Sequence, residues 1–135
     1  MATKKSVGRK KQTKKASHKA FNLVPYLKQK LRRISYQFPP RKEAIKKARV
    51  SRGLYECAKC NGHFRHGEFQ LDHVNPVDDP HTGFVSWDDY ISRLFVAVDL
   101  WQILCTQCHA AKTLYENEIR KQIRQEKKKD EDNDI

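Results

Sequence analysis

The sequence predicts a small α+β domain that is preceded by a basic helical extension. The first observation is size. The chain has 135 residues, 38% hydrophobic and 33% charged, which allows one modest core. The second is the pattern of apolar residues, which alternate with polar residues in some short segments and recur with the period of a helix in others. The third is a set of four cysteines in two closely spaced pairs. Domains this small often need a metal in addition to apolar burial.

Composition and periodicity divide the chain into four segments, namely a disordered basic tail (1–20), a basic helical extension (21–53), a compact domain (54–129) and an acidic tail that frays (130–135). Helices are expected over 27–38 and 41–51, separated by Pro39-Pro40. The apolar side of the first helix would consist of Leu27, Leu31, Ile34 and Phe38.

The compact domain is predicted to alternate strands and helices. The expected elements are a strand, a cysteine knuckle and a return strand over 54–64, a strand over 68–73, a helix over 87–95, a strand over 100–105 and a helix over 106–129. Ser86 precedes the first of these helices, with Asp89 three positions on, as at a capped start. The last helix would have an apolar side formed by Tyr115, Ile119 and Ile123.

Positive charge is concentrated at the N-terminal end. Residues 1–53 contain 18 Lys or Arg and one acid, whereas residues 54–135 contain 10 Lys or Arg and 15 acids. Such a block favours a polyanion, and DNA is the expected partner, held mainly by its phosphate backbone. A solvated tail is the alternative. The residues expected to contact DNA are Lys10, Lys11, Lys14, Lys15, Arg32, Arg33, Arg41, Lys46, Lys47 and Arg49.

Two further features concern where the protein works. The longest apolar run, residues 95–98, is far too short to span a membrane, so no membrane partner is expected. The lysine-rich start has no apolar segment behind it, which predicts a cytoplasmic protein that is not secreted. In that compartment cysteines serve as metal ligands more often than as disulfides.

The cysteines have the spacing of a structural zinc site. Cys57 and Cys60 form one pair, and Cys105 and Cys108 form the other, with 44 residues between the pairs. A gap of two residues lets a tight turn point both sulfurs at one tetrahedral ion. A redox Cys-x-x-Cys is the rival interpretation, but no thioredoxin-like βαβ pattern surrounds either pair. His63, His66 and His109 are possible substitute ligands.

An acidic residue and two histidines form a second candidate site. Asp72 and His73 end a predicted strand, and His109 follows the last cysteine on the closing helix. Cys108 and His109 point about 100° apart on a helix, so His109 can face the strand that carries Asp72. Neighbours on a strand face opposite sides, so Asp72 and His73 can share a site only if the backbone twists there. A surface histidine and a turn-capping aspartate are the structural alternative.

The order of these motifs resembles the HNH nuclease family in its zinc-containing form. The segments "CAKC", "LDHVNP" and "LWQILCTQCHAAKT" are similar to the small HNH endonucleases of tailed phages, over roughly residues 41–115. The resemblance implies a ββα-metal fold, in which two strands and a helix hold one catalytic divalent ion. It implies His73 as the general base, Asp72 and His109 as ligands of that ion, and the four cysteines as ligands of structural Zn²⁺.

One position departs from the family pattern. Leu100 stands where the family has the asparagine that braces the loop carrying the base, and Asp99 or Gln102 is expected to supply the brace. The catalytic ion would be Mg²⁺ or Mn²⁺, while Ni²⁺ or Zn²⁺ also fits oxygen and nitrogen ligands.

The function that the sequence predicts is metal-dependent endonuclease cleavage of DNA. The expected reaction is phosphodiester hydrolysis, by nicking or double-strand cutting, and phage packaging proteins are a possible further partner. The first alternative is a non-catalytic zinc-ribbon protein that binds nucleic acid. The second is a zinc-stapled interaction module whose basic tail binds an acidic protein.

Overall fold

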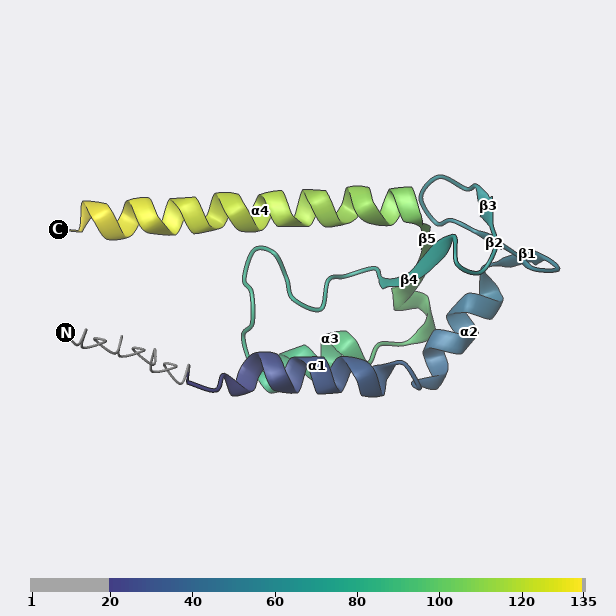
Figure 1. Cartoon of the computed structure of the whole chain (residues 1–135), viewed down its shortest axis with the longest axis horizontal. Helices are drawn as coiled ribbons and strands as arrows, with labels where there is room; N and C mark the ends of the chain where they lie inside the picture. The colour runs from purple at the N-terminus through teal and green to yellow at the C-terminus, as the bar shows by residue number, and fades with distance from the viewer. Residues whose placement is uncertain (1–19, 135) are drawn as a thin grey trace, which may run out of the picture.

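The computed structural model of this chain describes residues 20–134, in which helices are combined with two small antiparallel sheets (Figure 1). The helices are α1 (Leu23–Ser35), α2 (Pro39–Lys47), α3 (Trp87–Leu94), the 3₁₀ turn η1 (Val98–Leu100) and α4 (Thr106–Asn133). The strands are β1 (Arg49–Ser51), β2 (Leu54–Glu56), β3 (His63–Phe64), β4 (Phe69–His73) and β5 (Trp101–Cys105). The predicted small α+β class is confirmed.

The pairing of β4 with β5 places the candidate site. The register runs from Phe69 opposite Cys105 to His73 opposite Trp101, with Asp72 opposite Gln102. β4 and β5 are neighbours in the sheet although 27 residues separate them in sequence. α4 begins directly after β5, so the two strands and the start of the helix lie together. A separate three-stranded sheet, in the order β1-β2-β3, carries the first cysteine pair after β2.

The buried side chains form two clusters. The first contains Cys57, Leu104 and Cys105, with Phe64 and Cys108 packed against it. The second contains Val77, Tyr90 and Leu94, with Leu31, Trp87 and Phe95 packed against it. Leu31 therefore fastens α1 to the long connection between β4 and β5. Because both clusters are small, apolar burial alone gives each of them limited stability.

The N-terminal helices differ in their bounds from the prediction. α1 starts at Leu23, where the Asn22 side chain accepts a hydrogen bond from the Val24 amide, and it ends three residues before Phe38. Ile34, predicted to lie on the apolar side, is 61% exposed. α2 begins at Pro39. A proline ends a preceding helix, and it is also favoured at the first position of the next one.

Residues 49–51 form a strand, so the prediction of a helix through residue 51 is wrong. Arg49 pairs with Tyr55 across a tight hairpin. Gly53, with a φ of 73°, supplies the left-handed conformation that the connection between β1 and β2 requires. The β-branched Val50 also fits a strand better than a helix.

α4 continues beyond the predicted end. It extends to Asn133, through most of the segment expected to fray, and its second half projects away from the rest of the fold (Figure 1). Ile119 and Ile123 are partly buried as predicted, but Tyr115 is 68% exposed. None of the helices within residues 20–134 combines the length and apolar character needed to cross a membrane. The predicted disordered tail, with Lys10, Lys11, Lys14 and Lys15, lies outside the described residues.

Candidate functional site

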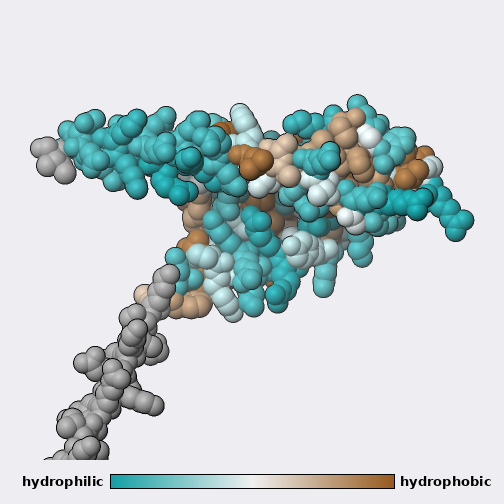
Figure 2. Space-filling model, turned by 45° about the horizontal axis from the view of Figure 1, so that its top comes forward, coloured by the Kyte–Doolittle hydropathy of each residue, from teal (hydrophilic) through white to brown (hydrophobic). Residues whose placement is uncertain are grey.

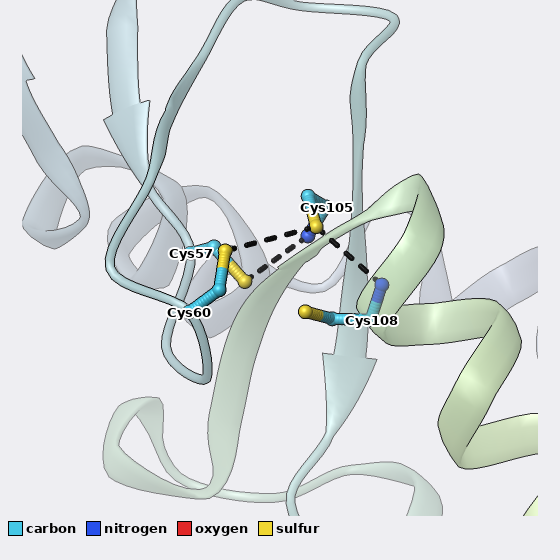
Figure 3. Close-up of side chains that lie close together, drawn as sticks. All are labelled: Cys57, Cys60, Cys105 and Cys108. Carbon is cyan, nitrogen blue, oxygen red and sulfur yellow. Dashed lines mark hydrogen bonds between the residues drawn. The ribbon is translucent and has the colours of Figure 1, made fainter.

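The four cysteines form one group that can hold a metal ion (Figure 3). Their ligand atoms all lie within 4.8 Å of one another, and the sulfurs of Cys60 and Cys105 are 3.9 Å apart. Sulfurs around a tetrahedral zinc are about 3.8 Å apart, because each Zn–S bond is about 2.3 Å. The distances therefore fit the predicted Zn²⁺, which is one of the metals that four tetrahedral thiolates bind. The group contains no histidine among the described residues.

Backbone amides point at the sulfurs, as they do in cysteine knuckles. The amide of Cys105 donates to Cys57 Sγ over 3.3 Å, and the amide of Cys108 donates to Cys105 Sγ over 3.4 Å. Burial alone would raise the pKa of Cys57, but amide hydrogen bonds outweigh it and lower that pKa to about 6. Hydrogen bonding to Cys105, reinforced by desolvation, raises the pKa of Cys108 to about 12. Clustered thiolates repel one another, and a divalent cation offsets that repulsion.

Asp72, on β4, and His109, on α4, approach each other. Asp72 Oδ1 lies 3.9 Å from His109 Nε2. Two ligands in one coordination sphere of about 2.1 Å radius lie between about 3.0 Å and about 4.2 Å apart, so one ion can contact both atoms. The expectation that His109 turns toward the strand carrying Asp72 is confirmed. Gln102, opposite on β5, donates from Nε2 to Asp72 Oδ2 over 3.3 Å.

His73 is held from two directions. Its ring lies 3.9 Å, centroid to centroid, from that of Trp101, its partner across the sheet. Its Nε2 bonds to the carbonyl oxygen of Leu94 over 2.9 Å. Burial lowers the pKa of His73 below its ordinary value, and the charges of Arg41 and Arg32 act in the same direction. The imidazole is therefore mainly neutral at neutral pH.

A polar cleft of about 280 Å³ is lined by all three predicted catalytic residues, Asp72, His73 and His109. Asp72 and His73 extend from opposite sides of a strand, as shown by their different partners on β5. The strand ends at His73, and the cleft at this end is lined by both.

Sequence reasoning missed Lys112, which lines the cleft and contacts Asp72. Its Nζ donates to Asp72 Oδ2 and to the carbonyl oxygen of His73, the latter over 2.7 Å. Glu116 Oε1 is 3.5 Å from the same ammonium, and Arg120 lines the cleft one turn further on. The sequence does carry a signal that could have identified them. Lys112, Glu116 and Arg120 follow His109 by three, seven and eleven positions, a spacing that places them on one side of a helix.

Leu100, the position at which the resemblance predicts an asparagine, contacts the segment after His73 through its main chain. Its carbonyl oxygen accepts a hydrogen bond from the Val74 amide over 2.9 Å, immediately after His73. A main-chain acceptor is available whatever the residue type. Of the two expected substitutes, Gln102 contacts Asp72, whereas the exposed Asp99 pairs with Lys47 over 3.0 Å. Asp99 therefore takes no part in the cleft.

The predicted DNA-binding residues within the described part of the chain lie in different surroundings. Arg32 lines the cleft, and its Nε donates to the Tyr90 hydroxyl over 3.2 Å. The Arg41 guanidinium lies 4.8 Å and 5.0 Å from the ring centroids of Tyr36 and Trp101, and burial lowers its pKa. The side chains of Arg33, Lys46, Lys47 and Arg49 are exposed.

Comparisons of this chain with protein-family models, curated proteins and solved structures find no significant match.

Proposed function

We propose that this chain is a metal-dependent endonuclease of the HNH type that hydrolyses DNA phosphodiester bonds. The observation that carries the proposal is the shared cleft. A half-buried imidazole, His73, and a carboxylate–imidazole pair, Asp72 and His109, line one polar cavity although His109 comes from α4 and the other two residues come from β4. A protein that only binds nucleic acid needs no such combination.

His73 is the general base. A carbonyl oxygen can only accept a hydrogen bond, so the contact with Leu94 assigns the ring proton to Nε2 and leaves Nδ1 as the basic nitrogen. A water oxygen attacks phosphorus while Nδ1 takes its proton. The bond from phosphorus to the 3′ oxygen then breaks, and that oxygen takes a proton from solvent. The products have 5′-phosphate and 3′-hydroxyl ends.

Asp72 and His109 would hold the divalent ion, with Mg²⁺ or Mn²⁺ as the expected metals. When bound, the ion supplies Lewis acidity at the phosphoryl group and stabilises the leaving oxygen. Gln102 and Lys112 both contact Asp72 Oδ2, which leaves Oδ1 facing His109. These two contacts fix the orientation of the carboxylate.

The test is cleavage of supercoiled plasmid with and without Mg²⁺ or Mn²⁺. His73→Ala should lower the rate about 10²–10⁴-fold, the usual contribution of a general base, at unchanged DNA affinity. His109→Ala should recover in part at high Mn²⁺, because the metal site remains half formed. His63→Ala is the matched control, because His63 is exposed on β3 and does not line the cleft. A His73→Ala protein that cuts at the wild-type rate would refute the assignment.

A non-catalytic zinc protein that binds nucleic acid is the second candidate. The observation that favours it is the ammonium of Lys112 on Asp72, which competes with a metal ion for the carboxylate. In this case the protein would bind DNA in a salt-dependent manner, and neither Mg²⁺ nor Mn²⁺ would produce nicks in the plasmid.

A further inference from the structure

The second half of α4 packs against little of the protein. Beyond Ile123 every residue to Asp134 is exposed, and hydrophilic side chains cover this part of the helix (Figure 2). A helix that is polar on all sides is usually stabilised by ion pairs between successive turns or by a partner. Within the described residues, the ion pairs of α4 side chains all lie at or before Arg120.

Positive charge on this part of α4 is confined to a short segment. Residues 120–129 contain six Lys or Arg and one acid, Glu126, whereas residues 130–134 contain four acids. At 100° per residue, Arg120, Arg124 and Lys127 fall within about 60° of one another around the helix. We call these three residues the cationic side of α4. Lys121 and Lys129 lie about 90° and about 170° away from its centre.

The cationic side is continuous with the proposed catalytic cleft. Arg120 lines the cleft that contains Asp72 and His109. It also lines a second hollow, of about 230 Å³, in which Arg124 and Lys127 face residues 80–83 of the loop after β4. Arg120 itself is engaged, because it donates to the carbonyl oxygen of Asp78 over 3.0 Å. Neither Arg124 nor Lys127 has an acidic group within 4.0 Å in residues 20–134.

We infer that the cationic side of α4 binds the phosphate backbone of duplex DNA that flanks the cleavage point. This inference rests on the proposed function and extends it, because it assigns one flank of the substrate to a helix outside the basic N-terminal block. Arg124 and Lys127 contact phosphates, and Arg120 holds the loop that forms the opposite wall of the hollow. Contacts of this kind position the duplex without reading its sequence.

The helix also sets the length of the contacted flank. Lys127 lies 18 positions after His109, a rise of about 27 Å at 1.5 Å per residue. A duplex rises 3.4 Å per base pair, so a helix lying along it covers about eight base pairs from the cleft. Glu131, one turn beyond Lys127, lies on the same side and repels phosphate, which ends the contact there.

The experiment measures DNA affinity against salt for the full-length protein, without added Mg²⁺ or Mn²⁺ so that nothing is cut. The probe is a blunt 30-base-pair duplex. The test variant is Arg124→Gln with Lys127→Gln, and the control is Lys121→Gln with Lys129→Gln. Both variants remove two charges from the same helix, and Gln keeps a similar helix propensity. Circular dichroism should show equal helix content in both.

We expect the test variant to flatten the log–log salt slope by about 1.8, or 0.9 for each lost phosphate contact, while the control stays within about 0.5 of wild type. Equal slopes for the two variants would overturn the inference and leave the proposed nuclease function standing. A wild-type protein that binds no duplex would overturn both. If the salt slopes are as expected but the plasmid assay shows no cleavage with Mg²⁺ or Mn²⁺, flank binding would be supported and the proposed hydrolysis refuted.

Discussion

Replacing Lys112 with Met tests whether the ion pair between Lys112 and Asp72 organises the cleft. Met matches the four-atom apolar stem of Lys but removes the ammonium, and with it the charge and both hydrogen bonds, to Asp72 and to the His73 carbonyl. Glu116, 3.5 Å from the ammonium, loses its counter-charge as well. About a fifth of each side chain is exposed, at 21% for Lys112 and 19% for Asp72, so solvent moderates the loss.

The magnitude follows from that partial burial. Breaking a fully buried pair costs about 3–5 kcal/mol, and a lost hydrogen bond to a charged group costs about 1.5–3 kcal/mol. We therefore expect Lys112→Met to lower the free energy of unfolding by about 2–3 kcal/mol. Lys121→Met is the matched control, because this exposed position on the same helix should change stability by less than about 0.5 kcal/mol.

The assay is urea unfolding followed by circular dichroism, with and without Mn²⁺. Removing the ammonium frees Asp72 Oδ2 and takes a positive charge away from the proposed metal site, so Mn²⁺ should stabilise Lys112→Met more than it stabilises wild type. A ligand at 100 times its dissociation constant adds about 2.7 kcal/mol. Equal midpoints for the two Met variants would refute the structural role. Equal stabilisation of wild type and Lys112→Met by Mn²⁺ would refute the competition for Asp72.

Two further predictions concern the metal group and the pH dependence. Cys105→Ser should abolish tight zinc binding and unfold β4, β5 and the start of α4, because such sites supply about 10–16 kcal/mol, and metal analysis with circular dichroism checks this. A folded variant with normal zinc content would contradict it. The pKa of His73 is lowered in the fold, so its contribution to stability is present above about pH 6.5 and is lost as the pH falls through the folded value. Urea unfolding between pH 8 and pH 5 should show a weaker acid dependence in His73→Gln, and cleavage should fall over the same acidic range. An identical acid dependence in the variant and wild type would rule out His73 as its source.

The elements that the sequence predicts well are those with a short-range signal. The two-residue gap within each cysteine pair identifies the knuckles, and the alternation of Phe69 and Leu71 identifies β4. Ser86 marks the start of α3, where its side chain accepts a hydrogen bond from the Asp89 amide over 3.1 Å. In each case the residues that carry the signal also make the local structure.

The features that escape the sequence depend on contacts between distant residues. Asp72 meets Lys112 across 40 positions, and Asp78 meets Lys28 across 50 positions, at 2.8 Å. No local pattern relates the members of either pair. The second contact shows why α1 is part of the cleft wall instead of a detached basic arm. Its Arg32 also approaches Asp78, at 3.6 Å.

The start of α4 connects the metal group to the cleft. Cys105 ends β5 and caps α4, Cys108 follows within the first turn, and His109 is the next residue. A metal ion held by the cysteines would fix the rotation of this turn, and with it the direction in which His109 points, about 100° away. The same turn is anchored on β4, where Phe69 pairs with Cys105 at the opposite end of the strand from Asp72 and His73. Because His109 directly follows Cys108, the distance between His109 and Asp72 depends on how the cysteine group is held. No cysteine itself lines the cleft.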